Sequence, residues 1–353
     1  MDKKVSTLSL AMTITGTFIG AGFASGSELW QFFGIFGKTG LLSMFFSLAM
    51  LCVICIMITR FCVINKRFYL DTAVFEDAPK IVNTVFCSLE MVLYFFFSVI
   101  MTSAFVALIE SFIGRTASLI CGFAFITIVG ISLFFGLSGL VKLFSFFVPF
   151  LVAATVIISI VTITTNGITF TPKDAEITSG SPLLRIPALA CFLSLSYNFF
   201  GSIGVLAPLS KNAKSTKQIT FAAILGIFSL GVIASAILLA IFSSGAHNEA
   251  LPMLEIAKSI NPVVGIIYAI FLSSAMFGCS YSSSVCTILF FEKKFLHTKL
   301  KKIIFIILYV AIVYSVSLLG FTDLISTVYP IFGYVGFALI IAVIYNSISY
   351  RRK

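Results

Sequence analysis

The chain has 353 residues, of which 59% are hydrophobic and 10% are charged, whereas a soluble domain carries about 25% charged residues. This composition excludes an ordinary soluble protein, because so apolar a chain cannot keep its surface in water. The formal net charge of +10 would suggest nucleic-acid binding in a soluble protein, but here most basic residues lie between apolar segments. We therefore expect an all-α integral membrane protein whose partners include the lipid bilayer but no nucleic acid.

Ten apolar segments follow one another along the chain, and each is predicted to be a transmembrane helix, because about 20 apolar residues cross a bilayer. The predicted spans are 5–35, 39–59, 81–109, 114–136, 139–164, 183–209, 218–243, 262–290, 303–320 and 324–348. If the N-terminus is cytoplasmic, most Lys and Arg residues lie in the segments on the cytoplasmic side. The exceptions are Lys38, Arg115, Lys173, Arg185 and Lys258. The positive-inside rule therefore predicts that both termini are cytoplasmic. Because most connections are short, we interpret residues 1–353 as one membrane domain of unknown oligomeric state.

The first span contains the stretch TGTFIGAGFASGSELWQFF, residues 15–33, in which Gly16, Gly20, Gly22 and Gly26 precede Glu28. Each glycine weakens a helix by about 1 kcal/mol relative to alanine, so the run needs a physical reason. In one interpretation the chain leaves helical geometry here, and the freed carbonyls bind a cation while freed N–H groups bind an anion such as a carboxylate. In the other interpretation, two G-x-x-x-G pairs only permit close helix packing.

The sixth span carries an anomaly at a matching position. Ten spans divide into two sets of five, and because five is odd the halves would be related by inversion, as in many secondary transporters. We expect the two inverted repeats to be 1–165 and 183–348. Polar residues and glycines gather in the middle of span six, namely Ser194, Ser196, Tyr197, Asn198, Gly201, Ser202 and Gly204. The pattern predicts that helices 1 and 6 are both broken and that a solute binds between them.

The eighth span adds hydroxyl groups in the stretch SSAMFGCSYSSSVC, where Ser280, Ser282, Ser283 and Ser284 lie close together along one helix. Hydroxyls are hard oxygen donors that suit a small cation when backbone carbonyls complete its shell. The alternative is that these serines bond to carbonyls of their own helix or mediate helix packing.

Three glutamates lie in or near the predicted spans. Glu28 follows the glycine run, Glu90 lies in the inner third of span three with Tyr94 one turn beyond it, and Glu110 lies near the outer end of that span. Carboxylates inside a membrane are costly and are therefore functional candidates. We interpret Glu28 and Glu90 as candidates for protonation or for pairing with a cation, and Glu110 as interfacial. For Glu28, the alternative is a capping role at a half-helix that restarts near residues 25–27.

Three connections are longer than the others. The cytoplasmic one after span two is predicted to hold a short amphipathic helix, and the external one between spans five and six is predicted to be irregular. The external stretch SSGAHNEALPMLEIAKSINP carries the apolar residues Leu251, Leu254 and Ile256 together with the two prolines Pro252 and Pro262. This spacing predicts a brief helix, which would serve either as a lid or as a helix on the membrane surface.

Residues 15–32, TGTFIGAGFASGSELWQF, resemble the first span of the YkvI-like bacterial membrane proteins, which carry the run I-G-A-G-F-A-S-G followed by an acidic residue. That family looks like a branch of the amino acid–polyamine–organocation superfamily. The resemblance implies a LeuT-like fold of ten transmembrane helices with a five-plus-five inverted repeat and with helices 1 and 6 broken. It also implies a location in the bacterial cytoplasmic membrane.

The resemblance to the sodium-coupled members of the superfamily further implies roles for particular residues. A sodium ion would be held by the carbonyls of Gly16, Ile19 and Cys279 and the hydroxyls of Ser282 and Ser283. The substrate would lie beside Ala21, Gly22 and Tyr94, with Ser196, Tyr197, Asn198 and Gly201 from span six as its wall. Two residues depart from the pattern. Thr17 replaces an asparagine that some members use for a second sodium, and Glu28 has no counterpart, which leaves proton coupling open.

These observations predict a secondary active transporter for a small amino acid or related amine, working by alternating access. Ion-coupled symport is expected, with sodium favoured over protons and no other cofactor. A channel, or a solute-sensing membrane protein of the same fold, is the alternative. An enzyme is not expected, because no G-x-S-x-G motif is present and the one C-x-x-C pair, Cys52 and Cys55, has no histidine near it in the sequence.

Overall fold

The computed structural model describes residues 5–69, 80–168, 184, 186–295 and 298–350, and all regular secondary structure within these ranges is helical. The first predicted span comprises α1 (Thr7–Phe18), α2 (Ala21–Ser25), α3 (Ser27–Phe32) and the short 3-10 helix η1 (Gly34–Phe36). The remaining helices of the first half are α4 (Gly37–Asn65), α6 (Lys80–Ile113), α7 (Arg115–Ser132), η2 (Leu133–Phe135) and α8 (Gly136–Asn166). The second half consists of α9 (Pro187–Ser210), α10 (Thr216–Ser244), η3 (Ala246–Asn248), α11 (Pro252–Ile260), α12 (Pro262–Lys294), α13 (Lys299–Ser317) and α14 (Phe321–Tyr350).

Eight helical segments in the described part of the chain are long and apolar enough to cross a membrane. The two predicted spans outside this set are the first, which the structure divides into short helices, and 324–348, which lies within α14. The count of ten spans therefore stays a prediction. Large apolar side chains such as Leu42, Ile120 and Phe228 are exposed on the outside of the bundle, as expected for helices that face lipid.

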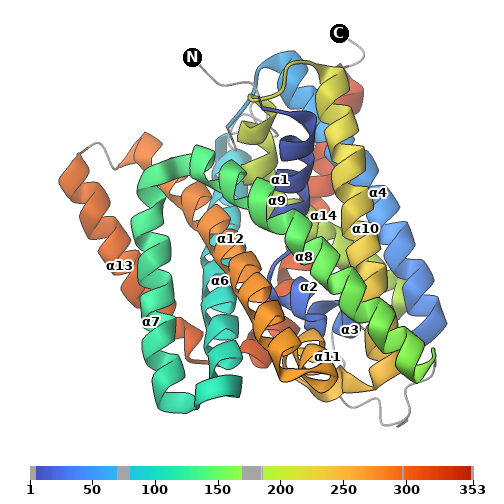
Figure 1. Ribbon diagram of the computed structural model, residues 1–353. Helices are drawn as coiled ribbons and strands as arrows, with labels where there is room; N and C mark the ends of the chain where they lie inside the picture. The colour runs from blue at the N-terminus through green and yellow to red at the C-terminus, as the bar shows by residue number, and fades with distance from the viewer. Residues whose placement is uncertain (1–4, 70–79, 169–183, 185, 296–297, 351–353) are drawn as a thin grey trace.

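The helices form two packed groups. In one, α9 packs against α4 and α14, and α10 packs against α1 and α4. In the other, α6 packs against α7, α12 and α13. Helix α8 contacts α1, α10 and α12 and so connects the groups. Figure 1 shows that α1 begins and α14 ends at the same end of the bundle, while α11 lies at the opposite end.

The first span leaves helical geometry, as predicted. Ile19 has φ −85° and ψ 90°, and Gly20 has φ −94° and ψ −175°, so the two residues between α1 and α2 are extended. A second interruption occurs at Gly26, whose φ of 90° favours glycine. A Cβ atom at Gly26 would also lie 2.6 Å from Ile241 Cδ1. The first span is therefore broken after Phe18 and bent again before α3.

The prediction that helix 6 is broken was wrong. Helix α9 is continuous from Pro187 to Ser210. Its glycines permit close packing instead, because an added Cβ would overlap the Phe97 ring at Gly201 and the Tyr94 hydroxyl at Gly204. Both aromatic side chains come from α6. In span six, therefore, the glycines serve helix packing.

The connections differ in how far the structure describes them. The predicted brief helix of the external stretch is confirmed as α11, which lies between the two prolines. Its residues Met253, Leu254, Ile256 and Ala257 are buried, and it packs against α2, α8, α10 and α12. Helix α11 thus covers one end of the bundle, as a lid would. The predicted amphipathic helix after span two and the irregular external connection fall mainly on residues 70–79 and 169–183, outside the described residues.

Candidate functional site

The break after α1 leaves two backbone carbonyls without hydrogen-bond donors. Ile19 N–H still donates to Thr15 O at 3.2 Å, and Gly20 N–H folds back onto Phe18 O at 3.1 Å. Neither the Gly16 carbonyl nor the Ile19 carbonyl accepts a hydrogen bond from any described residue outside the regular pairing of α1. Ile19 is 1% exposed. Since a buried unpaired carbonyl is costly in a membrane, these two oxygens are suited to a bound cation.

The same break leaves N–H groups without backbone partners at the start of α2. Ala21 N–H points at the thioether sulfur of Met101, 3.1 Å away, which is a weak acceptor. Gly22 and Phe23 N–H donate to no described backbone or side-chain acceptor, and Gly20 offers no side-chain cap. These donors form an electropositive end that favours a carboxylate or another anion.

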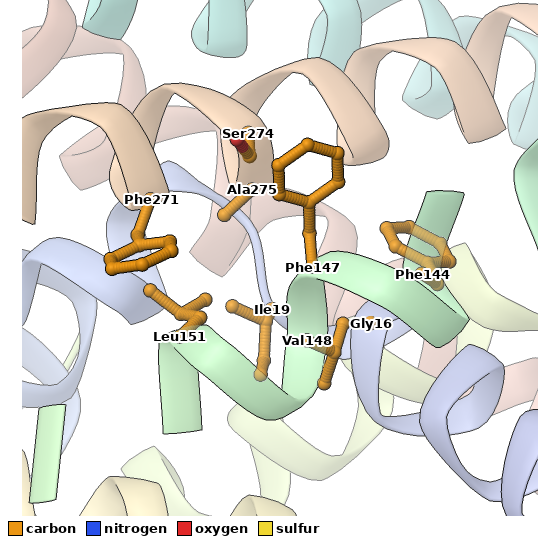
Figure 2. A pocket seen from close by; sticks show the side chains of 9 residues that line it. All are labelled: Gly16, Ile19, Phe144, Phe147, Val148, Leu151, Phe271, Ser274 and Ala275. Carbon is orange, nitrogen blue, oxygen red and sulfur yellow. The ribbon is translucent and has the colours of Figure 1, made fainter. Parts of the chain in front are cut away.

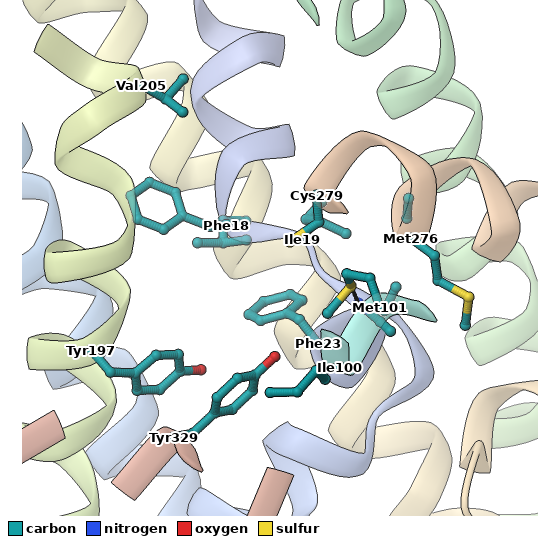
Figure 3. Close-up of a cluster of buried hydrophobic side chains, with 14 of the residues drawn as sticks. Phe18, Ile19, Phe23, Ile100, Met101, Tyr197, Val205, Met276, Cys279 and Tyr329 are labelled. Atoms are coloured by element: carbon teal, nitrogen blue, oxygen red, sulfur yellow. Dashed lines mark hydrogen bonds between the residues drawn. The ribbon is translucent and has the colours of Figure 1, made fainter. Parts of the chain in front are cut away.

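A small cavity lies beside this break. Its walls include Gly20, Glu28, Tyr197, Asn198, Gly201 and Cys279. Figure 3 shows Tyr197 of α9 and Tyr329 of α14 with their hydroxyl groups directed towards the region around Phe18 and Phe23. The cavity volume is about 20 Å³, which is room for about one water molecule. The cavity as it stands is therefore too small for a solute of amino-acid size.

Glu28 connects the first span to helix α9. The side chain lies in the first turn of α3 and is 5% exposed. Tyr197 Oη donates a hydrogen bond to Glu28 Oε1, and the Tyr197 ring stacks on Tyr329 with 4.8 Å between centroids. Glu28 Oε2 has no donor among the described residues and lies 3.1 Å from the position of a Cβ at Gly22. One carboxylate oxygen is thus bonded, and the other lies beside the start of α2.

The hydroxyls of span eight bond within their own helix. Ser282 Oγ and Ser283 Oγ both donate to the Cys279 carbonyl, at 2.9 and 2.8 Å. The protons of these two hydroxyls are therefore used in hydrogen bonds within the helix, as the alternative interpretation stated. Their oxygen lone pairs remain available as acceptors, because each hydroxyl has used only its donor. Cys279 lines the central cavity, and its sulfur lies 3.4 Å from the Cβ position of Gly20, so α12 reaches the break as the resemblance implied.

Gly16 and Ile19 also border a separate apolar cavity of about 10 Å³. Figure 2 shows it between α1, α8 and α12, with Phe144, Phe147 and Leu151 from α8 and Phe271 from α12. The Phe144 ring lies over Gly16, where a Cβ would approach it to 2.6 Å. Gly16 is therefore needed for the packing of α8 against α1, whatever its carbonyl binds.

Three of the predicted site residues lie elsewhere. Tyr94 Oη donates to Glu90 Oε1 at 2.5 Å and accepts from Gly204 N–H at 2.8 Å, so Glu90 and Tyr94 join α6 to α9 and do not line the central cavity. Ser196 Oγ donates to Gly333 O of α14 at 2.6 Å and also lies away from the cavity. Glu110 is half-exposed and forms an ion pair with Arg115 at 2.7 Å, which agrees with an interfacial position.

Sequence reasoning missed several residues around the break. Phe97 and Tyr329 line the central cavity, and Met101 contacts Ala21. Tyr329 precedes Pro330, a proline inside α14, and this mid-span proline was a detectable signal. Phe97 and Met101 gave no signal, because one more apolar residue in an apolar span does not stand out.

The fold defines a class of membrane proteins, those with the LeuT fold. The structure of MhsT in complex with L-phenylalanine matches with a TM-score of 0.70 and 16% identity, over 96% of this chain and 89% of MhsT. Mhp1, a nucleobase-cation-symport-1 family transporter, matches with a TM-score of 0.60 and 13% identity, over 89% and 72%. A manganese transporter of Eremococcus coleocola matches with a TM-score of 0.58 and 12% identity, over 96% and 77%.

Two proteins of Bacillus subtilis (strain 168) are similar along almost their entire length. The membrane protein YkvI is 28% identical over 366 residues, which cover 100% of this chain and 99% of YkvI. The protein YyaD is 24% identical over 364 residues, which cover 97% of both chains. No family model matches the chain. The resemblance to YkvI-like membrane proteins, predicted from residues 15–32, is thus confirmed over the whole chain.

Proposed function

We propose that the protein is a secondary active transporter that binds a small amino acid or related amine at the break between α1 and α2. The proposal rests on backbone groups at this break that have no hydrogen-bond partner among the described residues. They are the carbonyls of Gly16 and Ile19 and the N–H groups of Gly22 and Phe23. The N–H groups suit the carboxylate of an amino acid, and Glu28 on the wall of the same cavity suits its amine. The L-phenylalanine bound by MhsT agrees with a solute of this class.

Sodium is the proposed coupling ion. The Gly16 and Ile19 carbonyls lack donors, and the lone pairs of Ser282 and Ser283 lie on α12, which packs against α1 and α2. Neutral oxygens of this kind suit a hard monovalent cation. In a continuous helix, backbone N–H groups would bond to these two carbonyls. Bound sodium would take the place of those missing donors.

The contacts of the first span support alternating access. Helix α1 is bound to α10 through Thr15 Oγ1, which donates to Gly226 O at 3.0 Å. Helix α3 is bound instead to α9 by the Glu28–Tyr197 bond, and Ser27 Oγ donates to Ala250 O just before α11. The two halves therefore have different hydrogen-bond partners and are joined by extended residues, which would let one half move without unwinding the other.

Thermal-shift screening of the purified protein against amino acids and amines, in sodium and in potassium buffers, tests the binding site. We expect one solute class to raise the melting temperature and to do so more strongly in sodium, because a ligand stabilises the state that it binds. The stabilising solute is then tested for uptake into proteoliposomes with an inward sodium gradient.

The possible results separate the candidate functions. Sodium-driven accumulation supports the proposal. Stabilisation without uptake would identify a solute-sensing protein of the same fold, and a solute flux far above carrier turnover that needs no gradient would identify a channel. Absence of any stabilising amino acid or amine would reject the proposed substrate class.

A further inference from the structure

A second cavity lies on the other side of Glu28, between α3, α4, α9 and α10, and nothing above assigns it a role. Its volume is about 20 Å³, enough for one occupant of about the size of water. Its walls are apolar except for the four polar side chains Glu28, Ser47, Ser194 and Asn198. Glu28 and Asn198 also line the central cavity, so they form part of the wall between the two.

Three of the four polar side chains of this second cavity, Glu28, Ser47 and Asn198, present acceptors. Asn198 Nδ2 donates to Ser194 O at 2.9 Å and to Ser194 Oγ at 3.5 Å, which leaves Asn198 Oδ1 without a described donor. Ser47 Oγ donates to Cys191 O at 3.2 Å and so keeps only its lone pairs. Glu28 accepts one bond, from Tyr197. A carboxylate, an amide oxygen and a hydroxyl oxygen thus surround a space that offers no N–H donor from Asn198.

No cationic side chain compensates Glu28. Neither cavity that it borders is lined by Lys, Arg or His, and no ion pair within the described residues includes it. The ionisable groups that face it from the helices packed against α3 and the break are Tyr197, Tyr329 and Cys279. Because an uncompensated carboxylate in a membrane interior costs several kcal/mol, Glu28 needs either a proton or an external positive charge.

We infer that Glu28, Asn198 and Ser47 form a binding site for one compact monovalent cation, a sodium ion or a primary ammonium group. This site differs from the sodium site proposed between α1 and α12, because it uses a carboxylate and lies against α4 and α10. Hard oxygens that include one full charge suit such a cation. The inference does not rest on transport, since cation binding is measured without any solute.

Equilibrium binding of ²²Na⁺ to the purified full-length protein tests the inference, with ionic strength held constant by a large organic cation. We use the Ser283→Ala background, in which the site on α12 is weakened, so that the remaining binding reports on Glu28. In this background we expect Glu28→Gln to abolish ²²Na⁺ binding and Asn198→Leu to weaken it at least about tenfold, because a ligand is lost. Glu110→Gln removes an interfacial carboxylate and is the matched control, which should bind as before.

Methylammonium chloride is titrated in the same assay to distinguish the two cations. If methylammonium displaces ²²Na⁺, or alone raises the melting temperature of the parent protein but not of Glu28→Gln, the site accepts an ammonium group. Should Glu28→Gln bind as much ²²Na⁺ as its parent and respond equally to methylammonium, the inference is overturned. The Asn198→Leu variant keeps the test decisive if Glu28→Gln does not fold. The proposed transport function is tested separately: it fails if no amino acid or amine raises the melting temperature in the thermal-shift screen.

Discussion

At the scale of single residues, the glycines of the first span have different structural roles. Gly16 makes room for the Phe144 ring, and Gly26 has a positive φ. Gly20 is the residue that the proposed site needs, because it is extended and borders the central cavity, where its Cβ position lies 3.2 Å from Met101 Cε. A side chain at Gly20 would therefore occupy space that the solute requires.

We predict that Gly20→Leu abolishes solute-dependent stabilisation while membrane insertion stays normal, because the added side chain fills a cavity of about 20 Å³. Thermal unfolding with and without the stabilising solute measures the effect. Gly231→Leu is the matched control, since a Cβ there meets only Leu48 Cδ1, at an ordinary 3.7 Å. A full solute response in Gly20→Leu would contradict a binding site at the break.

The sodium site makes its own prediction at this scale. Ser283→Ala removes one oxygen from the proposed shell, and we expect the sodium concentration for half-maximal stabilisation to rise about tenfold, the equivalent of about 1.4 kcal/mol. Ser235→Ala is the control, because Ser235 Oγ donates to Gly231 O at 2.7 Å in the same intrahelical manner. Equal sodium titrations for both variants would remove Ser283 from the site.

At the scale of secondary-structure elements, α6 and α9 are joined by a buried hydrogen-bonded set. Tyr94 donates to Glu90 and accepts from the backbone of Gly204, and both side chains are at most 3% exposed. The hydroxyl group thus reaches the backbone of α9 at a position that only glycine allows. This contact fixes the spacing of the two helices.

Tyr94→Phe should therefore lower the melting temperature of the protein. The change leaves the Glu90 carboxylate and the Gly204 N–H without this partner, and an unsatisfied buried group costs about 1–3 kcal/mol. Tyr314→Phe removes the same atom from a partly buried tyrosine that donates to Leu119 O at 3.0 Å, and we expect a smaller effect. Equal melting temperatures for the two variants would show that the set contributes little.

The contrast between spans one and six shows what the sequence could predict. Both carry mid-span glycines, and for span one the glycine run offered a break as one of two interpretations and marked Glu28 as a functional candidate. Gly201 and Gly204 have the same appearance in sequence, but the partners that decide their role are Phe97 and Tyr94, about 100 residues away. Glycine spacing does not reveal whether a large side chain of another helix fills the space. The continuous α9 could therefore be found only from the structure.

At the scale of the whole molecule, the packing separates the two ends of the bundle. Helix α1 begins and α14 ends at one end of the bundle, and α11 lies at the other (Figure 1). Combined with the basic residues of the connections, this arrangement predicts that α11 faces outwards and that the α9–α10 connection is cytoplasmic.

Cysteine labelling with a membrane-impermeant maleimide checks this orientation in whole cells. We expect a cysteine at Glu249 to react in intact cells, and one at Lys214 to react only after permeabilisation, because both positions are exposed but at opposite ends. The eight native cysteines are buried or partly buried, and the unsubstituted protein measures their background. The reverse pattern would invert the topology.

The position of Glu28 on the wall of two cavities has a thermodynamic consequence. A positive charge placed in either cavity would change the electrostatic energy of an occupant in the other, because both would share one carboxylate. By linkage the effect is mutual, so the factor by which an ion tightens or loosens solute affinity must equal the factor by which the solute changes ion affinity. A single side chain could in this way link two equilibria without any movement of the backbone.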